Sequence, residues 1–199
     1  SWSLFVNLLV VAGLGLLTTA GFQIFGNRTN ISDRQTQLEQ QWDAGSGALI
    51  GEAAAAAFVK PPEPMPGDAI AKVSVPALGQ HWFVVEGVDP ADIAAAPGHF
   101  PNSADPGQKG NFALAAHRQI GLFWDLDKIR AGDEIMVETR QKTFTYVVTR
   151  NLITSPQIHA EVSAVPPGFR NGDRVLTLTT CNPKWDNYQR LVVHALLKK

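Results

Sequence analysis

The sequence predicts an all-β protein, a closed barrel of seven or eight short strands with short helices, preceded by an N-terminal transmembrane helix. Two observations lead to this prediction. From Gly67 onward, short runs of β-like composition are broken by Gly and Pro, with few helical segments between them. The start of the chain is instead a long uncharged apolar run. We therefore divide the chain into a membrane anchor (1–25), a stalk or linker (26–67) and a folded domain (68–199).

The apolar run from Trp2 to Phe25 contains no Asp, Glu, Lys or Arg. It is long enough to cross the hydrocarbon core of a bilayer, which is about 30 Å thick. The apolar part of a signal peptide is about half as long. A buried core helix is the alternative, but such helices nearly always carry charge on one face. We expect residues 2–25 to bind the lipid bilayer as a single-pass helix.

Residues 26–67 have the composition of a spacer. The segment 27–42 is polar and predicts an extension of the helix, which Gly45-Ser46-Gly47 ends. The proline-rich segment 60–67 predicts a stiff, extended connection. We interpret these residues as a stalk that gives the domain reach, and we expect a chain beginning near Gly67 to be soluble and functional.

The rest of the chain alternates between candidate strands and turns. Seven segments have strand composition and end at turn-forming residues: 70–75, 82–88, 111–117, 134–139, 143–154, 175–181 and 191–197. One short helix is predicted at 124–129. Many short strands with few helices favour a closed or nearly closed barrel, because closure leaves no strand edge exposed.

Cys181 is the only cysteine of the chain, and it ends the strand-like run 174–181. Asn182-Pro183 stops this run directly after the thiol, so a loop begins there and a substrate can reach the sulfur. A lone cysteine is more often a small buried hydrophobic residue than a nucleophile. The residues that surround it in the fold therefore decide its role.

Two basic residues stand at the ends of other candidate strands. Arg190 opens the run 190–196, and a hairpin between this run and the cysteine strand brings its guanidinium close to the sulfur. His117 ends the small-residue run 110–117. A histidine or arginine cation beside a thiol favours the reactive thiolate. A histidine, a cysteine and an arginine at three strand ends suit nucleophilic catalysis better than packing.

His194 is the one serious rival to His117, because it shares a strand face with Arg190. We favour a packed or hydrogen-bonded role for His194, since it is interior to its strand. The other histidines, His81, His99 and His159, occupy turn-like or loop segments.

Charge and motif spacing exclude several classes of function. The chain of 199 residues has a net charge of −1 and a pI near 6.5, so no positive field favours nucleic acid as a partner. No His or Cys pair has the spacing of a zinc site, and no glycine-rich nucleotide-binding loop occurs. We therefore expect neither a metal nor a cofactor.

The motifs around the three strand ends resemble the sortases, which are cell-surface cysteine transpeptidases of Gram-positive bacteria. Thr177-Leu178-Thr179-Thr180-Cys181 matches the sortase nucleophile signature, and Arg190 follows at the spacing of the family's arginine. Ala116-His117-Arg118 stands where sortases carry their histidine. The segments 181–184 and 189–195 are most similar to actinobacterial class E sortases, with class D next. The resemblance covers about residues 67–199.

The resemblance implies a sortase-type barrel whose catalytic domain lies outside the cell, anchored in the cell membrane. It implies that Cys181 attacks the threonine carbonyl of a sorting motif, that His117 transfers protons, and that Arg190 stabilises the oxyanion or holds the peptide. The implied motif is of the Leu-Ala-X-Thr-Gly or Leu-Pro-X-Thr-Gly type, cleaved between Thr and Gly. The implied acceptor is an amine of a cell-wall precursor.

Three further residues are candidate contacts to the sorting peptide. Thr180, beside the cysteine, shapes the peptide groove or is only a strand residue. Phe100 lies near a class E aromatic residue implicated in motif preference, or is a core aromatic residue. Ala116 replaces the glycine that class E enzymes usually have before the histidine, and this replacement bears on peptide preference.

Two alternative functions stay open from the sequence. The same chemistry can serve a pilin-polymerising sortase, which joins a pilin lysine to a sorting motif. A different class is a non-catalytic, membrane-tethered β-domain for adhesion or scaffolding. The rate of thiol labelling separates the second alternative, because a structural cysteine reacts slowly or only on unfolding.

Overall fold

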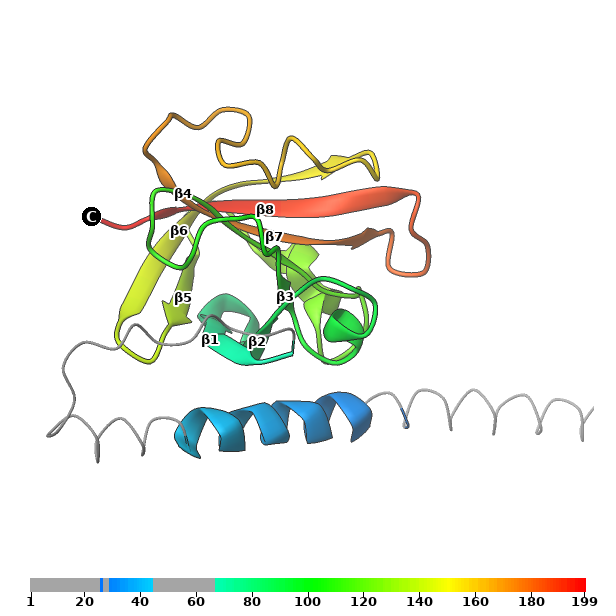
Figure 1. The fold of residues 1–199 in the computed structure, drawn as a ribbon. Helices are drawn as coiled ribbons and strands as arrows, with labels where there is room; N and C mark the ends of the chain where they lie inside the picture. Colours follow the sequence, from blue (N-terminus) through cyan, green and yellow to red (C-terminus); the bar gives the residue numbers. More distant parts are fainter. Residues whose placement is uncertain (1–25, 27–28, 45–66) are drawn as a thin grey trace, which may run out of the picture.

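The computed structural model describes residue 26, residues 29–44 and residues 67–199 (Figure 1). The predicted membrane anchor at 2–25 lies outside the described residues, as do residues 45–66. Within the part of the chain that is described, no helix has both the length and the apolar character needed to cross a bilayer. The anchor stays a prediction.

Eight strands close into a barrel in the order β1-β2-β3-β4-β7-β8-β6-β5. Their bounds are Ala69–Val75 (β1), Gln80–Glu86 (β2), Gly98–His99 (β3), Gly110–Ala115 (β4), Glu134–Glu138 (β5), Thr143–Thr154 (β6), Arg174–Asn182 (β7) and Gln189–Leu197 (β8). The 3₁₀ helices are Pro76–Leu78 (η1), Asp92–Ala94 (η2) and Phe123–Lys128 (η3). The predicted all-β closed barrel is confirmed. The sequence pattern does not reveal β3, because two residues are too few to show alternation.

Two parallel pairings, β2–β3 and β4–β7, interrupt an otherwise antiparallel barrel. Because β4 and β7 run in the same direction, their carboxyl ends lie at the same edge. β8 is antiparallel to β7 and therefore begins at that edge. The ends of β4 and β7 and the start of β8 thus meet, and these positions carry the three candidate catalytic residues.

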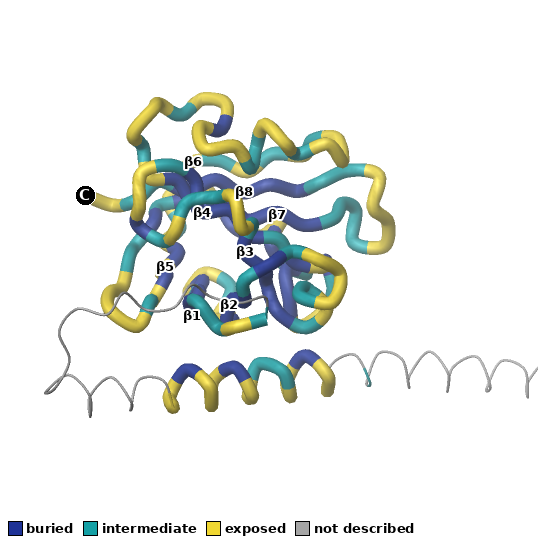
Figure 2. The backbone as a smooth tube through the Cα atoms, in the orientation of Figure 1, coloured by how far each residue is buried: buried dark blue, intermediate teal, exposed yellow. Residues whose placement is uncertain are grey.

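Alternation along the strands fills the barrel with apolar side chains. In Figure 2 the backbone of these strands is coloured as buried over long stretches. The interior of the three site-bearing strands is formed by Phe112, Leu114, Leu176, Leu178, Leu191, Val193 and Ala195. Each square ångström of apolar surface removed from water contributes roughly 25 cal/mol. This core fixes the strands whose ends form the site.

Trp82 ties the loop after β4 to the barrel. Its ring packs edge-on against Phe123, with the ring centroids 5.2 Å apart. Its Nε1–H donates to the Gly121 carbonyl at 2.8 Å. The buried indole therefore has a partner for its polar group and holds the loop that follows His117.

A helix at residues 29–44 lies along the outside of the barrel, next to β1 and β2 (Figure 1). Its buried apolar residues are Ile31, Leu38 and Trp42. They are spaced by seven and four residues and so share one face of the helix. Leu38 and Trp42 form a hydrophobic cluster with Phe83, Val85 and Ala96 of the barrel side.

Gln35, on the same helix face, completes this contact with hydrogen bonds to the backbone. Its Oε1 accepts from the Phe83 N–H at 2.7 Å, and its Nε2 donates to the Phe83 and Ala95 carbonyls, both at 3.3 Å. The sequence predicts a stalk here and not this contact, because the apolar stripe is thin among polar residues. In the structure, residues 29–44 pack on the barrel wall.

Candidate active site

Backbone pairing brings the three candidate catalytic residues to one edge of the barrel. Cys181 and Arg190 are directly opposite each other in the β7–β8 ladder. Ala115 lies opposite Thr179 in the β4–β7 ladder, so His117, two residues further on, comes level with Cys181. Directly opposite residues project from the same face of a sheet. The thiol and the arginine side chain therefore leave the barrel wall on one side.

The backbone that carries His117 is fixed by β7. The Ala116 N–H donates to the Thr179 carbonyl at 3.2 Å, and the buried Thr180 hydroxyl donates to the Ala116 carbonyl at 2.8 Å. These two bonds continue the contact between the strands beyond the last residue of β4. Thr180 thus acts on the site through the strand end that leads to the histidine.

A cleft of about 380 Å³ opens where the strand ends meet. His117 and Cys181 both line it, together with Arg118, Gln119 and residues 184–187 of the β7–β8 loop. His117 is exposed, and Cys181 is a partly exposed free thiol. The structure therefore brings the predicted nucleophile and the predicted proton-transfer group into one cleft that solvent can enter.

The Arg190 guanidinium is held by the β7–β8 loop. Its Nη1 donates to the Asn187 carbonyl at 2.6 Å and to the Gln189 carbonyl at 2.8 Å. Arg190 is not among the residues that line the cleft, although its backbone lies opposite Cys181. An arginine offers five N–H donors in a rigid fork, so two bonds from one nitrogen leave other donors for a ligand.

The three candidate peptide contacts do not line the cleft beside the thiol. Thr180 and Ala116 are buried, the latter in the barrel core. Phe100 is half-buried directly after β3, where its N–H donates to the Ala113 carbonyl at 3.0 Å. Their role in peptide binding stays a prediction.

Lys184 anchors the β7–β8 loop to η3. Its Nζ lies 3.2 Å from Asp125 Oδ1 and 3.5 Å from Asp127 Oδ1, and it sits 4.9 Å from the centre of the Trp124 ring. Burial opposes ionisation of Asp125, but hydrogen bonds from Lys128 and Lys184 outweigh it and lower the pKa of that carboxyl. The ion pairs of Lys184 therefore hold in place the side of the cleft that this loop forms.

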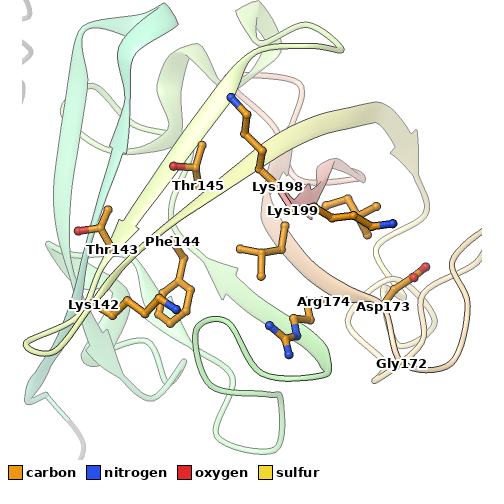
Figure 3. Close-up of a pocket in the computed structure, with 11 residues that line it drawn as sticks. Lys142, Thr143, Phe144, Thr145, Gly172, Asp173, Arg174, Lys198 and Lys199 are labelled. Carbon is orange, nitrogen blue, oxygen red and sulfur yellow. The ribbon is translucent and has the colours of Figure 1, made fainter.

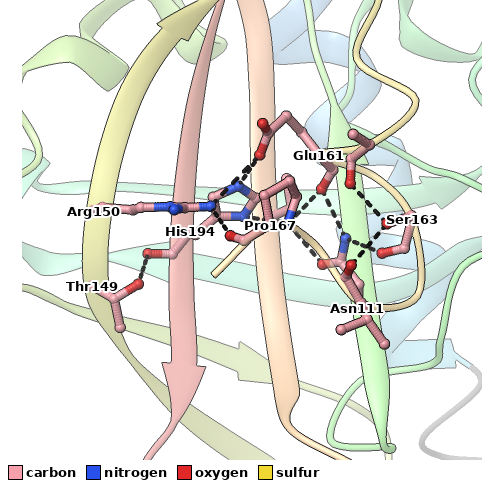
Figure 4. Close-up of polar contacts among 10 residues, drawn as sticks. Asn111, Thr149, Arg150, Glu161, Ser163, Pro167 and His194 are labelled. Atoms are coloured by element: carbon pink, nitrogen blue, oxygen red, sulfur yellow. Dashed lines mark hydrogen bonds and ion pairs between the residues drawn. The ribbon is translucent and has the colours of Figure 1, made fainter. Parts of the chain in front are cut away.

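His194 belongs to a buried polar network at a distance from the cleft (Figure 4). Its Nδ1 lies 2.9 Å from the Thr177 hydroxyl and its Nε2 lies 2.7 Å from Glu161 Oε2. Asn111 joins the network through a hydrogen bond that it accepts from Thr177 at 2.7 Å. His194 is four positions along β8 from Arg190, which is roughly 13 Å along a strand. The predicted packed and hydrogen-bonded role of His194 is confirmed.

A larger hollow of about 640 Å³ lies at the other end of β7 and β8 (Figure 3). Lys142, Arg174, Lys198 and Lys199 line it, and neither the thiol nor a histidine does. Among the described residues, no three His, Cys, Asp or Glu side chains gather as a metal site. We therefore place the candidate active site at the smaller cleft.

A closed eight-stranded barrel, with a thiol and an imidazole in one cleft at its edge, is the arrangement of a cysteine transpeptidase barrel. The family model described as the sortase domain matches residues 73–198, which is more than half of the chain. The chain belongs to the sortase family.

The relatives support the class E resemblance. Sortase SrtE1 of Streptomyces coelicolor is 34% identical over 140 residues, 64% of this chain. The structure of sortase E from Streptomyces avermitilis is 36% identical with a TM-score of 0.61, covering 68% of this chain and 91% of that one. A structure described as sortase E1 from Streptomyces coelicolor with a tripeptide in the active site is 31% identical with a TM-score of 0.63, covering 68% and 91%.

The match to the curated relative is partial on that protein's side. It spans 40% of the length of Sortase SrtE1. The similarity therefore applies to the barrel, which is the part that carries the candidate site.

Proposed function

We propose that this chain is a membrane-anchored cysteine transpeptidase of the class E type, which cleaves a C-terminal sorting motif and attaches the protein to a cell-wall amine. The observation that carries the proposal is the cleft shared by Cys181 and His117 in a sortase-family barrel. The lone cysteine of the chain is partly exposed at this cleft. A cysteine that served only packing has no need of either feature.

Cys181 and His117 divide the chemistry between them. The Cys181 thiolate attacks the threonine carbonyl carbon of the sorting motif and forms a tetrahedral intermediate. The bond to the glycine nitrogen then breaks, and His117 as imidazolium gives that amine its proton. A thioester remains on the sulfur. His117 as imidazole then takes a proton from the incoming amine as that amine attacks the thioester. The carbon–sulfur bond breaks and Cys181 leaves as thiolate, which restores the thiolate and imidazolium of the starting state.

Arg190 stabilises the negative charge that develops on the carbonyl oxygen. A guanidinium stays charged at all working pH values and presents several donors in a fixed plane. Its bonds to the Asn187 and Gln189 carbonyls hold one nitrogen at the base of the loop. The other donors are available to the oxyanion, where charge-assisted hydrogen bonds act most strongly in the transition state.

The substrate is a peptide of the Leu-Ala-X-Thr-Gly or Leu-Pro-X-Thr-Gly type, and the acceptor is an amine of a cell-wall precursor. The relative described with a tripeptide in its active site supports a peptide ligand for this barrel. The uncharged segment 2–25 supports attachment to the cell membrane. The location of the barrel outside the cell rests on the resemblance to the sortases.

Mass spectrometry of the full chain with a sorting peptide and triglycine tests this function. We expect cleavage after threonine, ligation to triglycine, and an enzyme adduct with the mass of the acyl fragment. Cys181→Ala should show neither adduct nor product. His81→Ala changes an exposed histidine of β2 outside the cleft and should keep both. Absence of adduct and product with both types of motif would contradict the proposed function.

A further inference from the structure

Three polar residues that flank the candidate catalytic residues in sequence are bonded to one another. Arg118 follows His117, Asn182 follows Cys181, and Gln189 precedes Arg190. Asn182 and Gln189 are also directly opposite each other in the β7–β8 ladder. Each of the three strand ends that form the site therefore contributes one member of this group.

The hydrogen bonds in this group are continuous from the histidine loop to the arginine strand. Arg118 Nη1 donates to Asn182 Oδ1 at 2.7 Å and to the Cys181 carbonyl at 3.3 Å. Asn182 Nδ2 donates to Gln189 Oε1 at 2.9 Å. One side-chain path thus links the backbone on either side of all three reactive groups.

Burial of the Arg118 cation at this position costs free energy. Its side chain is 4% exposed, and its Nη2 lies 3.0 Å from Asp127 Oδ1. Its Nε is buried and has no hydrogen-bond partner among the described residues. Burying a cation costs free energy even when it is paired, and an apolar side chain would fill the space without that cost. The donors of Arg118 therefore serve the site rather than packing alone.

We propose that Arg118, Asn182 and Gln189 form a clamp that positions Cys181 and Arg190 relative to His117 during transpeptidation. We call these three residues the strand-end clamp. The inference rests on the catalytic roles proposed above and adds the residues that hold those groups in register.

The clamp is needed because the ladder bonds end at this edge. The β7–β8 loop begins beyond Asn182, and its Trp185 is 84% exposed and its Tyr188 60% exposed. Strand ends next to exposed loops open readily. A misplacement of about 1 Å at reacting groups can cost roughly 10²-fold in rate.

Steady-state kinetics of Asn182 variants of the full chain on a sorting peptide test the clamp. Asn182→Ala removes both side-chain bonds, and we expect kcat to fall about 10- to 100-fold with KM nearly unchanged. Asn182→Asp should restore most of the rate. Its carboxylate can accept from Arg118, and the Gln189 amide can turn to donate to it.

Gln189→Ala removes the second bond of the clamp from its other end. If the clamp acts as a unit, the double variant Asn182→Ala/Gln189→Ala should be no slower than Asn182→Ala alone. Thr139→Ala is the matched stability control. It removes the hydrogen bond that the Thr139 hydroxyl donates to the Lys142 carbonyl in the turn between β5 and β6. This change should lower stability without lowering kcat.

Alkylation of Cys181 by iodoacetamide gives a readout that needs no peptide substrate. We expect Asn182→Ala to react several-fold more slowly than the parent chain, because the thiol is then no longer held beside His117 and Arg190. The alkylation rate tests the clamp even if no sorting peptide is cleaved. Failure to cleave any sorting peptide would count against the proposed function and not against the clamp.

Three results would each overturn the clamp. One is a kcat of Asn182→Ala equal to that of the parent chain. Another is an Asn182→Asp variant no faster than Asn182→Ala. The third is an alkylation rate of Asn182→Ala equal to that of the parent chain.

Discussion

At the residue scale, substitution of Arg190 separates its two candidate roles, which are stabilising the oxyanion and anchoring the peptide. Lysine at this position keeps the charge but loses the planar fork of donors. We expect Arg190→Lys to lower kcat by about 10²–10³, because that is the usual cost of losing one donor to an oxyanion. A residue that only anchors the peptide would instead raise KM and leave kcat little changed. Steady-state kinetics on a sorting peptide distinguish these results, and a rate equal to that of the parent chain would remove Arg190 from the catalytic set.

His117 lines the cleft, whereas His194 is buried away from it, so their substitution should affect activity differently. His117→Ala should lower the rate of transpeptidation by roughly 10²–10⁴, the usual contribution of a positioned acid or base. His194→Ala should keep most of the activity, because its bonds to Thr177 and Glu161 lie away from the cleft. Circular dichroism of both variants checks that they are folded. Similar losses in two folded variants would show that both histidines take part.

The buried His194 also predicts a dependence of stability on pH. Burial lowers its pKa below the ordinary value of 6.5, Arg150 acts in the same direction, and hydrogen bonding to Glu161 opposes both. Below about pH 6.5 the unfolded chain therefore binds a proton that the folded chain binds less readily. The free energy of unfolding should fall as the pH drops below that value and should gain nothing from this group above it.

Urea unfolding at about pH 7 and pH 5 measures this effect. His194→Gln removes the titrating group and keeps an amide that can form hydrogen bonds, so its stability should change less between the two pH values. Titrating groups that do not contact His194 are common to both chains and cancel in the comparison. A variant whose stability declines as steeply as that of the parent chain would exclude His194 as the source.

At the scale of the elements, the helix at 29–44 changes the expectation for a shortened chain. A chain beginning near Gly67 loses the contacts that cover Phe83, Val85 and Ala96. Leu38→Ala should lower the free energy of unfolding by about 2–5 kcal/mol, the usual cost of truncating a buried leucine. Gln37→Ala alters an exposed position on the same helix and should change it by less than about 0.5 kcal/mol.

Thermal unfolding of these two variants, and of chains beginning at 29 and at 67, measures the contribution of the helix. Equal stability of Leu38→Ala and Gln37→Ala would show that the docked helix does not stabilise the barrel. The shorter chain should melt at a lower temperature than the one that begins at 29. If the two chains melt at the same temperature, the barrel is complete without the helix.

The elements also show what sequence patterns reveal and what they miss. The seven longer strands follow from alternation and turn residues, since each has at least five residues to show a period. β3 has two residues and is fixed by its partners β2 and β4. The docking of residues 29–44 depends on the shape of the barrel wall, which no local pattern contains.

At the scale of the whole molecule, the site follows from topology. The hairpin of β7 and β8 is local, so the pairing of Cys181 with Arg190 could be predicted from the sequence. The parallel pairing of β4 with β7 joins segments that are distant in sequence. The position of His117 beside Cys181 could therefore be inferred only from the family resemblance. The sequence does not predict the strand-end clamp. Arg118, Asn182 and Gln189 form no motif of their own and are marked only by the catalytic candidates beside them.

At the same scale, the predicted membrane anchor at 2–25 can be tested by substitution. Two lysines in the apolar run, Val11→Lys with Leu14→Lys, should each cost about 2.5–3.5 kcal/mol of insertion at the helix centre. We expect the parent chain to stay in the membrane pellet after carbonate extraction and the double variant to be released. The matched change of both residues to alanine keeps the run uncharged and should not release the protein.

The side of the membrane on which the barrel lies can be read from the same protein. Cys181 is the only cysteine of the chain and is partly exposed, so it is a unique label site. A membrane-impermeant maleimide added to intact cells should label it if the barrel is outside. Labelling only after the cells are broken open would place the thiol inside the cell and contradict the proposed location, because cell-wall amines would then be out of its reach.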